Sequence, residues 1–115
     1  MVELIWLRTA NNDLIQVYNY IYKDSIYYSI KTVNDIVNLV EKLKVFPYMG
    51  RKIPEYNIES QRELIYKSYR IIYKIESDNV FIRRIWHSKR EMPIDLISWY
   101  LIQRCFIHNK KFKIL

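Results

Sequence analysis

The chain has 115 residues, half of them hydrophobic, and a formal net charge of +7. This length suits one compact domain, and the short apolar runs exclude a segment of the roughly 20 apolar residues that cross a bilayer. The N-terminus lacks the features of a secretion signal, and the single cysteine, Cys105, excludes an internal disulfide. We therefore expect a cytoplasmic protein with no metal site, no cofactor and no membrane partner.

The positive charge is confined to the second part of the chain. Residues 1–45 contain five cationic and five acidic side chains, whereas residues 46–115 contain 14 cationic and seven acidic ones. Such an asymmetry usually indicates a polyanionic or acidic partner for the basic part. The alternative is a basic surface that only keeps the protein soluble.

The chain begins with a strand and a helix. Val2, Leu4 and Trp6 alternate with other residues and predict a short strand. Thr9 then offers a hydroxyl group as an N-cap. Apolar residues that recur every three or four positions predict a helix over residues 10–23.

A second, longer helix is predicted from about Ser25 to Lys44, with Asp24 or Ser25 as its cap and Pro47 enforcing its end. Its apolar stripe follows steps of four and three residues. The stripe consists of Ile26, Ile30, Val33, Val37 and Val40. Because the link to the first helix is short, we expect the two helices to form an antiparallel hairpin.

Residues 47–55, PYMGRKIPE, contain the only glycine and two of the three prolines in the chain. Glycine and proline are poorly tolerated inside helices and strands. We therefore expect this segment to be the loop that turns from the helices to the sheet and positions Arg51 and Glu55.

After this loop the periodicity changes to two. Alternating residues over 62–66, 69–75 and 80–87 predict three antiparallel strands in a meander. Leu96, Trp99 and Ile102 then indicate a further helix, near residues 95–104.

The order of these elements predicts an α+β fold. We expect an N-terminal strand, a helical hairpin, then antiparallel strands that form a twisted sheet with helices on one face, and a C-terminal helix. Residues 1–104 would form the single domain, and residues 105–115 a basic C-terminal tail.

The last two strands bring basic residues together if their turn occupies residues 76–79. Ile75 then lies opposite Val80, and Arg70 opposite Ile85. This register places three basic side chains on one solvent-facing side: Arg70, Arg83 and His87. The reverse side, which includes Trp86, would form the core against the helices, although Arg84 interrupts it.

The predicted basic face suits acid–base chemistry on RNA. His87 would act as general acid and Glu55 as base, while Arg51 and Arg70 neutralise charge on the phosphate. No metal is required. The structural alternatives are that His87 only makes hydrogen bonds and that Glu55 pairs with a nearby cation, Lys52 or Arg62.

The motifs GRKIPE and RELIYKSYRIIYKI, followed by a strand that ends at His87 with Arg90 just beyond, resemble the RelE/ParE superfamily of type II toxin–antitoxin toxins. The resemblance spans residues 2 to about 93. It implies a toxin of a plasmid stabilisation or addiction system that arrests growth and is neutralised by a cognate antitoxin. The family fold, two helices against an antiparallel sheet, agrees with the predicted elements.

The superfamily has two activities. One is metal-independent cleavage of ribosome-bound mRNA, in which Glu55, Arg70 and His87 match the base, phosphate stabiliser and acid of YoeB-type members. The other belongs to ParE-type members, which poison DNA gyrase by protein contact and are not nucleases. Further residues expected to bind substrate or another anion are Arg51, Lys52, Arg62, Arg83 and Arg90.

Two departures from RelE-type nucleases favour the gyrase poison: no tyrosine lies beside His87, and the central loop offers Lys52 instead of a lysine cluster. The endonuclease remains the alternative, so the resemblance leaves open whether the chain is an enzyme. A third possibility is a degenerate member that only binds its antitoxin. In each case we expect an acidic, partly disordered antitoxin that docks on the basic part of the chain.

Overall fold

The computed structural model describes residues 1–88, which form a helical hairpin and a five-stranded sheet. The helices are α1 (Arg8–Tyr22), α2 (Ile26–Glu41) and the short 3₁₀ helix η1 (Lys42–Lys44). The strands are β1 (Glu3–Trp6), β2 (Arg51–Lys52), β3 (Gln61–Tyr66), β4 (Tyr69–Glu76) and β5 (Asn79–His87). The predicted C-terminal helix, the tail and the domain boundary at residue 104 lie outside these residues. None of the helices within residues 1–88 is long and apolar enough to span a bilayer.

The α+β fold class is confirmed, but the sheet is mixed instead of purely antiparallel. Its strand order is β1-β5-β4-β3-β2, and β1 runs parallel to β5 whereas the other neighbours are antiparallel. Periodicity identifies a strand but not its partner or direction. Strand β2 has only two residues, too few for an alternating pattern to be recognised.

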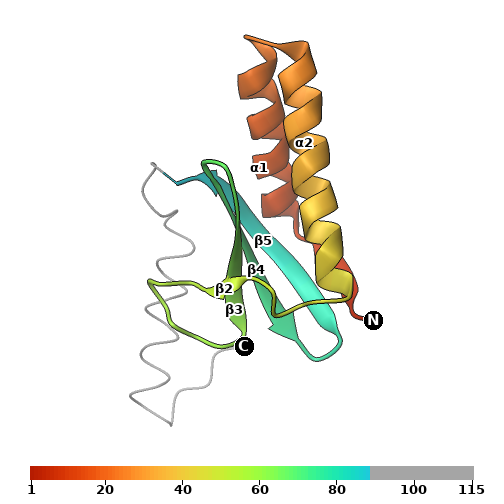
Figure 1. The fold of residues 1–115 in the computed structure, drawn as a ribbon, viewed down its shortest axis with the longest axis vertical. Helices are drawn as coiled ribbons and strands as arrows, with labels where there is room; N and C mark the ends of the chain where they lie inside the picture. The colour runs from red at the N-terminus through yellow and green to blue at the C-terminus, as the bar shows by residue number, and fades with distance from the viewer. Residues whose placement is uncertain (89–115) are drawn as a thin grey trace.

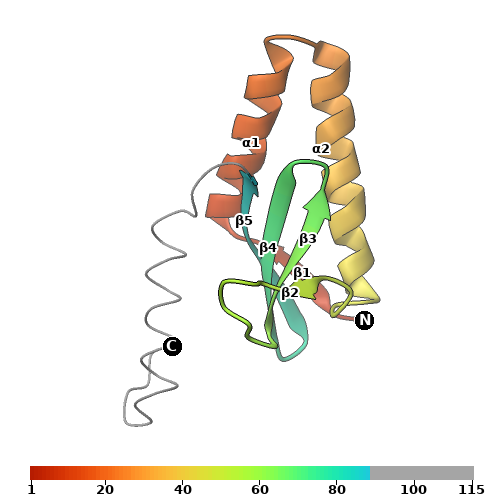
Figure 2. The same cartoon turned by 60° about the vertical axis from the view of Figure 1, so that its left-hand side comes forward.

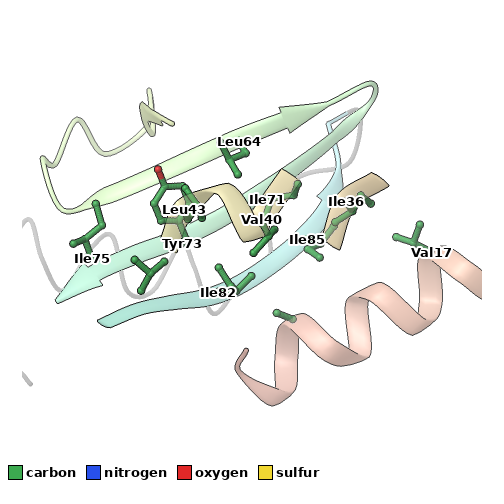
Figure 3. Close-up of a cluster of buried hydrophobic side chains, with 12 residues drawn as sticks. Val17, Ile36, Val40, Leu43, Leu64, Ile71, Tyr73, Ile75, Ile82 and Ile85 are labelled. Atoms are coloured by element: carbon green, nitrogen blue, oxygen red, sulfur yellow. The ribbon is translucent and has the colours of Figure 1, made fainter. Parts of the chain in front are cut away.

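The hairpin of α1 and α2 covers one face of the sheet (Figure 1). Its apolar side chains pack on those of β3, β4 and β5 in the main core (Figure 3). The fully buried members of this core include Ile36 and Val40 of α2 and Ile71, Tyr73 and Ile82 of the sheet. The joined ends of the two helices project beyond the sheet in both views (Figures 1 and 2).

The buried stripe of α2 differs from the predicted one at the N-terminal end of the helix. Ser29 and Thr32 are buried there, whereas Ile26 and Ile30 are 55% and 47% exposed. The helix has two apolar stripes, and only the C-terminal half of α2 lies over the sheet (Figure 2). Within residues 1–88, α1 is the only partner available at the projecting end, and small side chains, those of Ser29 and Thr32, face it.

The predicted caps have different outcomes. Ser25 does cap α2, because its hydroxyl accepts a hydrogen bond from the Tyr28 amide at 3.2 Å. Thr9 is not an N-cap, because α1 begins earlier, at Arg8. The Thr9 hydroxyl instead donates to the Arg83 carbonyl of β5 at 2.7 Å.

Asp13 fastens α1 to β5 where β1 has ended. The pairing of β1 with β5 stops at Ile82, which would leave the next amides of β5 without a partner strand. The buried Asp13 Oδ2 accepts from the Ile85 amide at 2.9 Å and from Arg84 Nε at 2.7 Å, and Oδ1 accepts from Arg84 Nη2 at 3.1 Å. Beyond the end of β1, hydrogen bonds between the side chains of Thr9 and Asp13 and the β5 backbone therefore take the place of hydrogen bonds to a neighbouring strand.

Replacing Asp13 should therefore cost much of the stability of this small domain. Asp13→Ala removes the carboxylate that accepts from the buried Ile85 amide and from the largely buried Arg84 guanidinium, which should lower the free energy of unfolding by about 2–4 kcal/mol. Urea denaturation followed by circular dichroism measures this loss. Asp24→Ala, in the link between the helices, is the control, with an expected change within about 0.5 kcal/mol. Equal effects of the two substitutions would contradict the anchoring role.

Candidate functional site

The pairing of β4 with β5 determines which side chains share a face. The hairpin begins as predicted, with Ile75 opposite Val80. The register then shifts by one residue: Tyr73 pairs with Ile82 but Ile72 pairs with Arg84, so Arg83 is inserted between these two pairs. Such a bulge inserts one residue into one strand and moves every later side chain by one position along the pleat.

This shift overturns the predicted basic face. Arg70 lies opposite Trp86 instead of Ile85, and Tyr69 lies opposite His87. Successive residues of a strand point to opposite faces, so Arg70 and His87 lie on different sides of the sheet. The His87 ring packs edge-on against Tyr69, with ring centroids 5.5 Å apart. The predicted gathering of three basic side chains on one face is wrong.

The prediction that Trp86 belongs to the core beneath the helices is wrong. Trp86 lies on the other face in a second, smaller cluster with Ile53, Tyr56 and Ile72. The Arg70 guanidinium stands over its ring, 4.8 Å from the centroid. This second core fastens the loop between β2 and β3 to the side of the sheet away from the helices (Figure 1).

Arg70 is held between two carboxylates. Its Nε and Nη2 donate to the two oxygens of Glu63 at 2.8 and 2.7 Å. Its Nη1 and Nη2 donate to the two oxygens of Glu55 at 2.9 and 2.8 Å. All three guanidinium nitrogens therefore already bind carboxylates, and the Arg70 side chain is only 13% exposed.

The charges of this cluster balance. A second guanidinium, that of Arg51, lies 3.5 Å from the fully buried Glu63 carboxylate, so two cations face two anions. The hydrogen bonds from Arg70 lower the pKa of Glu55, although partial burial opposes this, and they raise the pKa of Arg70. Glu55 is consequently a weak base, and the cluster has little excess positive charge with which to attract a phosphate.

Two further predicted anion-binding residues have structural partners. Lys52 Nζ lies 3.0 Å from Glu59 Oε2, and Arg62 Nη2 lies 2.6 Å from Glu59 Oε1. Arg62 Nη1 also donates to the Gly50 carbonyl at 2.9 Å. Both cations therefore stabilise the loop around Glu59. Neither pairs with Glu55, so the alternative in which Glu55 pairs with Lys52 or Arg62 is wrong.

Of the remaining predicted cations, Arg83 is the inserted residue of the bulge, and Arg90 lies outside the described residues. His87 borders a groove of about 590 Å³ between α1 and β5, together with Gln16, Tyr20 and Tyr69. A separate, shallower depression is lined by Arg51, Pro54, Glu55, Ile65, Arg70 and Ser88. The predicted acid therefore borders one hollow, and the predicted base and phosphate stabiliser border another.

Gly50 is required by close packing. Its φ angle is not positive, but a Cβ atom at this position would lie 2.6 Å from both the Glu63 carbonyl and the Tyr73 hydroxyl. The fully buried Tyr73 hydroxyl accepts from the Gly50 amide at 3.0 Å and donates to the Pro47 carbonyl at 2.8 Å. Desolvation raises the pKa of Tyr73 to about 12, so the hydroxyl remains a donor at neutral pH. Tyr73 thereby fixes the start of the loop that carries Glu55.

Sequence reasoning missed the parts played by Asp13, Glu63 and Tyr73. A signal existed for the first, because Asp13 falls between Ala10 and Val17 on the buried stripe of α1. Its partner Arg84 interrupts the apolar pattern of β5 in the same way. Two charged residues that break two apolar faces are candidates for a pair.

A model of the family described as "ParE toxin of type II toxin-antitoxin system, parDE" matches residues 4–92. Among solved structures, a chain of the "Chromosomal ParDE TA system from P. aeruginosa" is 25% identical to this one, with a TM-score of 0.65. The match covers 77% of this chain and 98% of that chain. No curated protein matches the sequence significantly.

The hydrogen bonds of Tyr73 can be tested by Tyr73→Phe. This change leaves the buried Gly50 amide and Pro47 carbonyl without a partner but preserves the ring, so the free energy of unfolding should fall by about 1–3 kcal/mol. Tyr27→Phe is the matched control at an exposed tyrosine and should change stability by less than about 0.5 kcal/mol. An unchanged urea midpoint for Tyr73→Phe would rule out this role.

The ion pair of Glu55 predicts a pH dependence of stability. The pKa of Glu55 in the folded protein is below its ordinary value of 4.5, so its contribution is complete above that pH and is lost as the pH falls through the folded value. Glu55→Gln should therefore narrow the difference in unfolding free energy between pH 7 and pH 3, measured with urea. Glu3→Gln, at an exposed carboxylate of β1, should leave the difference unchanged. If the unfolding free energy of Glu55→Gln falls between pH 7 and pH 3 as much as that of the wild-type chain, the ion pair of Glu55 is not a source of the pH dependence.

Proposed function

Since the chain belongs to the family of ParE toxins of type II toxin–antitoxin systems, we propose that it arrests growth by binding and poisoning DNA gyrase and does not cleave RNA. The observation that carries this proposal is the placement of Arg70 and His87 on opposite faces of the sheet. A nuclease of this superfamily needs its base, phosphate stabiliser and acid around one phosphate group.

The state of Arg70 supports the same conclusion. A phosphate could reach its guanidinium only by displacing Glu55, which binds Arg70 through both carboxylate oxygens. Paired hydrogen bonds of this kind between ionised groups are among the strongest in proteins. In this arrangement the cluster stabilises the sheet and its loop, and inhibition of gyrase would rest on contact between protein surfaces.

The proposal includes neutralisation by a cognate antitoxin in the cytoplasm, where gyrase and DNA are found. The excess positive charge of residues 46–115 suits an acidic antitoxin segment. Charge complementarity of this kind accelerates association and favours the correct partner. A segment that is disordered when free can wrap around such a surface as it folds on binding.

His87→Gln and Glu55→Gln separate the gyrase poison from the nuclease. Each removes a predicted catalytic group and keeps a side chain that can form hydrogen bonds. When expressed without antitoxin, both variants should arrest growth and induce an SOS reporter to within about two-fold of the wild-type chain. Gyrase-mediated DNA cleavage by the purified proteins provides the direct measurement.

Circular dichroism of both variants controls for loss of the fold. Growth arrest that disappears in a folded His87→Gln protein would contradict the proposal. Primer extension that shows new cuts in translated messages would also contradict it, as would a flat SOS reporter during arrest by the wild-type chain.

A further inference from the structure

The projecting end of the helical hairpin exposes an unusual number of large side chains. We define the hairpin tip as the six large apolar or aromatic residues that are exposed on either side of the link between α1 and α2: Tyr20, Tyr22, Ile26, Tyr27, Tyr28 and Ile30. Their exposed fractions range from 47% to 68%. Exposed apolar groups scattered singly are normal on a protein surface, but several that gather at one end of a helical hairpin are candidates for an interaction site.

The tip is built for contact and not for packing within the domain. At the start of α2 the buried positions that face inward are the small polar Ser29 and Thr32, while the isoleucines point outward. The Ser29 hydroxyl donates to the Ile26 carbonyl at 2.6 Å, so it is satisfied within the helix. Apolar side chains that could have faced α1 are therefore presented to the outside.

The charge distribution identifies the partner. Residues 18–30 contain one cation, Lys23, and one anion, Asp24, so the tip is neutral in a chain of net charge +7. An acidic antitoxin segment gains no charge complementarity from a neutral surface, because the excess cations that would attract it lie in residues 46–115. Two copies of this chain repel each other through their basic parts, and the neutral tip is where they can meet without that repulsion.

We propose that the hairpin tip is the contact surface between two copies of this chain, which form a two-fold symmetric dimer. Ile36 is the first residue of α2 in the main core, and the part of the helix before it spans roughly 15 Å, so a tip-to-tip contact keeps the two sheets roughly 30 Å apart, more than three Debye lengths of ~8 Å. In both views the tip stands clear of the sheet (Figures 1 and 2).

The size of the tip suits a weak dimer. A tyrosine side chain offers roughly 150–250 Å², so six large side chains that are about half exposed present on the order of 600 Å². A stable interface of standard size uses about 800 Å² from each partner. Tyrosine is also enriched in interfaces, because its ring packs while its hydroxyl remains solvated. The inference is independent of the proposed action on gyrase.

Analytical ultracentrifugation of the purified full-length chain, free of antitoxin, tests this dimer from about 1 to 200 μM. The wild-type chain should show a concentration-dependent equilibrium between monomer and dimer. Tyr27→Glu and Ile30→Glu each place two like charges in a two-fold contact and should raise the dissociation constant at least ten-fold. Both positions are exposed, so circular dichroism should show an unchanged fold.

Phe46→Glu is the matched control, because Phe46 is an equally exposed aromatic residue at 63% but lies beyond η1, away from the tip. It should change the dissociation constant by less than two-fold. A wild-type chain that is monomeric at every concentration would overturn the proposal, as would equal weakening by the control. If the chain is monomeric and the tip substitutions abolish antitoxin binding, the tip is the antitoxin's binding surface. That result would also overturn the proposed dimer.

Discussion

The extra residue in β5 is the constraint on which the arrangement of the site depends. Because Arg83 is inserted between two successive residue pairs of β4 and β5, every later pair in the hairpin is displaced by one residue. The displacement places Trp86 beneath Arg70 on one face and His87 beside Tyr69 on the other. The same stretch of β5 has lost β1 as a neighbour, and Asp13 of α1 supplies the missing hydrogen bond to its backbone. Bulge and helix together fix which face each of these side chains occupies.

The face away from the helices is organised by buried polar contacts. Glu63 is fully buried, and burial of its negative charge without a cation would destabilise the fold. Arg70 supplies that cation, and Glu55 completes the cluster. Tyr73 holds the beginning of the same loop through Gly50 and thereby keeps Glu55 within reach. Two residues of the expected catalytic set, Glu55 and Arg70, thus stabilise the loop here, whereas the third, His87, lies on the other face of the sheet. This arrangement is the reason why we propose contact with a protein target and not cleavage of RNA.

Much of the fold could be predicted from the sequence, because apolar residues recur every second position in strands and every 3.6 positions in helices. The three later strands were placed within about one residue, and the Ser25 cap was correct. The candidate site could not be predicted to the same depth. A single inserted residue such as Arg83 leaves no mark on the alternating pattern, yet it moves Trp86 and His87 to the opposite faces. The exposed isoleucines of α2 were misplaced for a related reason, since periodicity reveals a stripe but not whether a partner covers it.

The position of His87 relative to Arg70 tests the central claim most directly, and NMR measures it without altering the protein. Nuclear Overhauser effects should connect the ring protons of His87 to those of Tyr69, whose centroid is 5.5 Å away, and the indole protons of Trp86 to the Arg70 side chain. No such effect should join His87 to Arg70. Cross-peaks between His87 and Arg70, with none between His87 and Tyr69, would restore the register without a bulge and contradict this account.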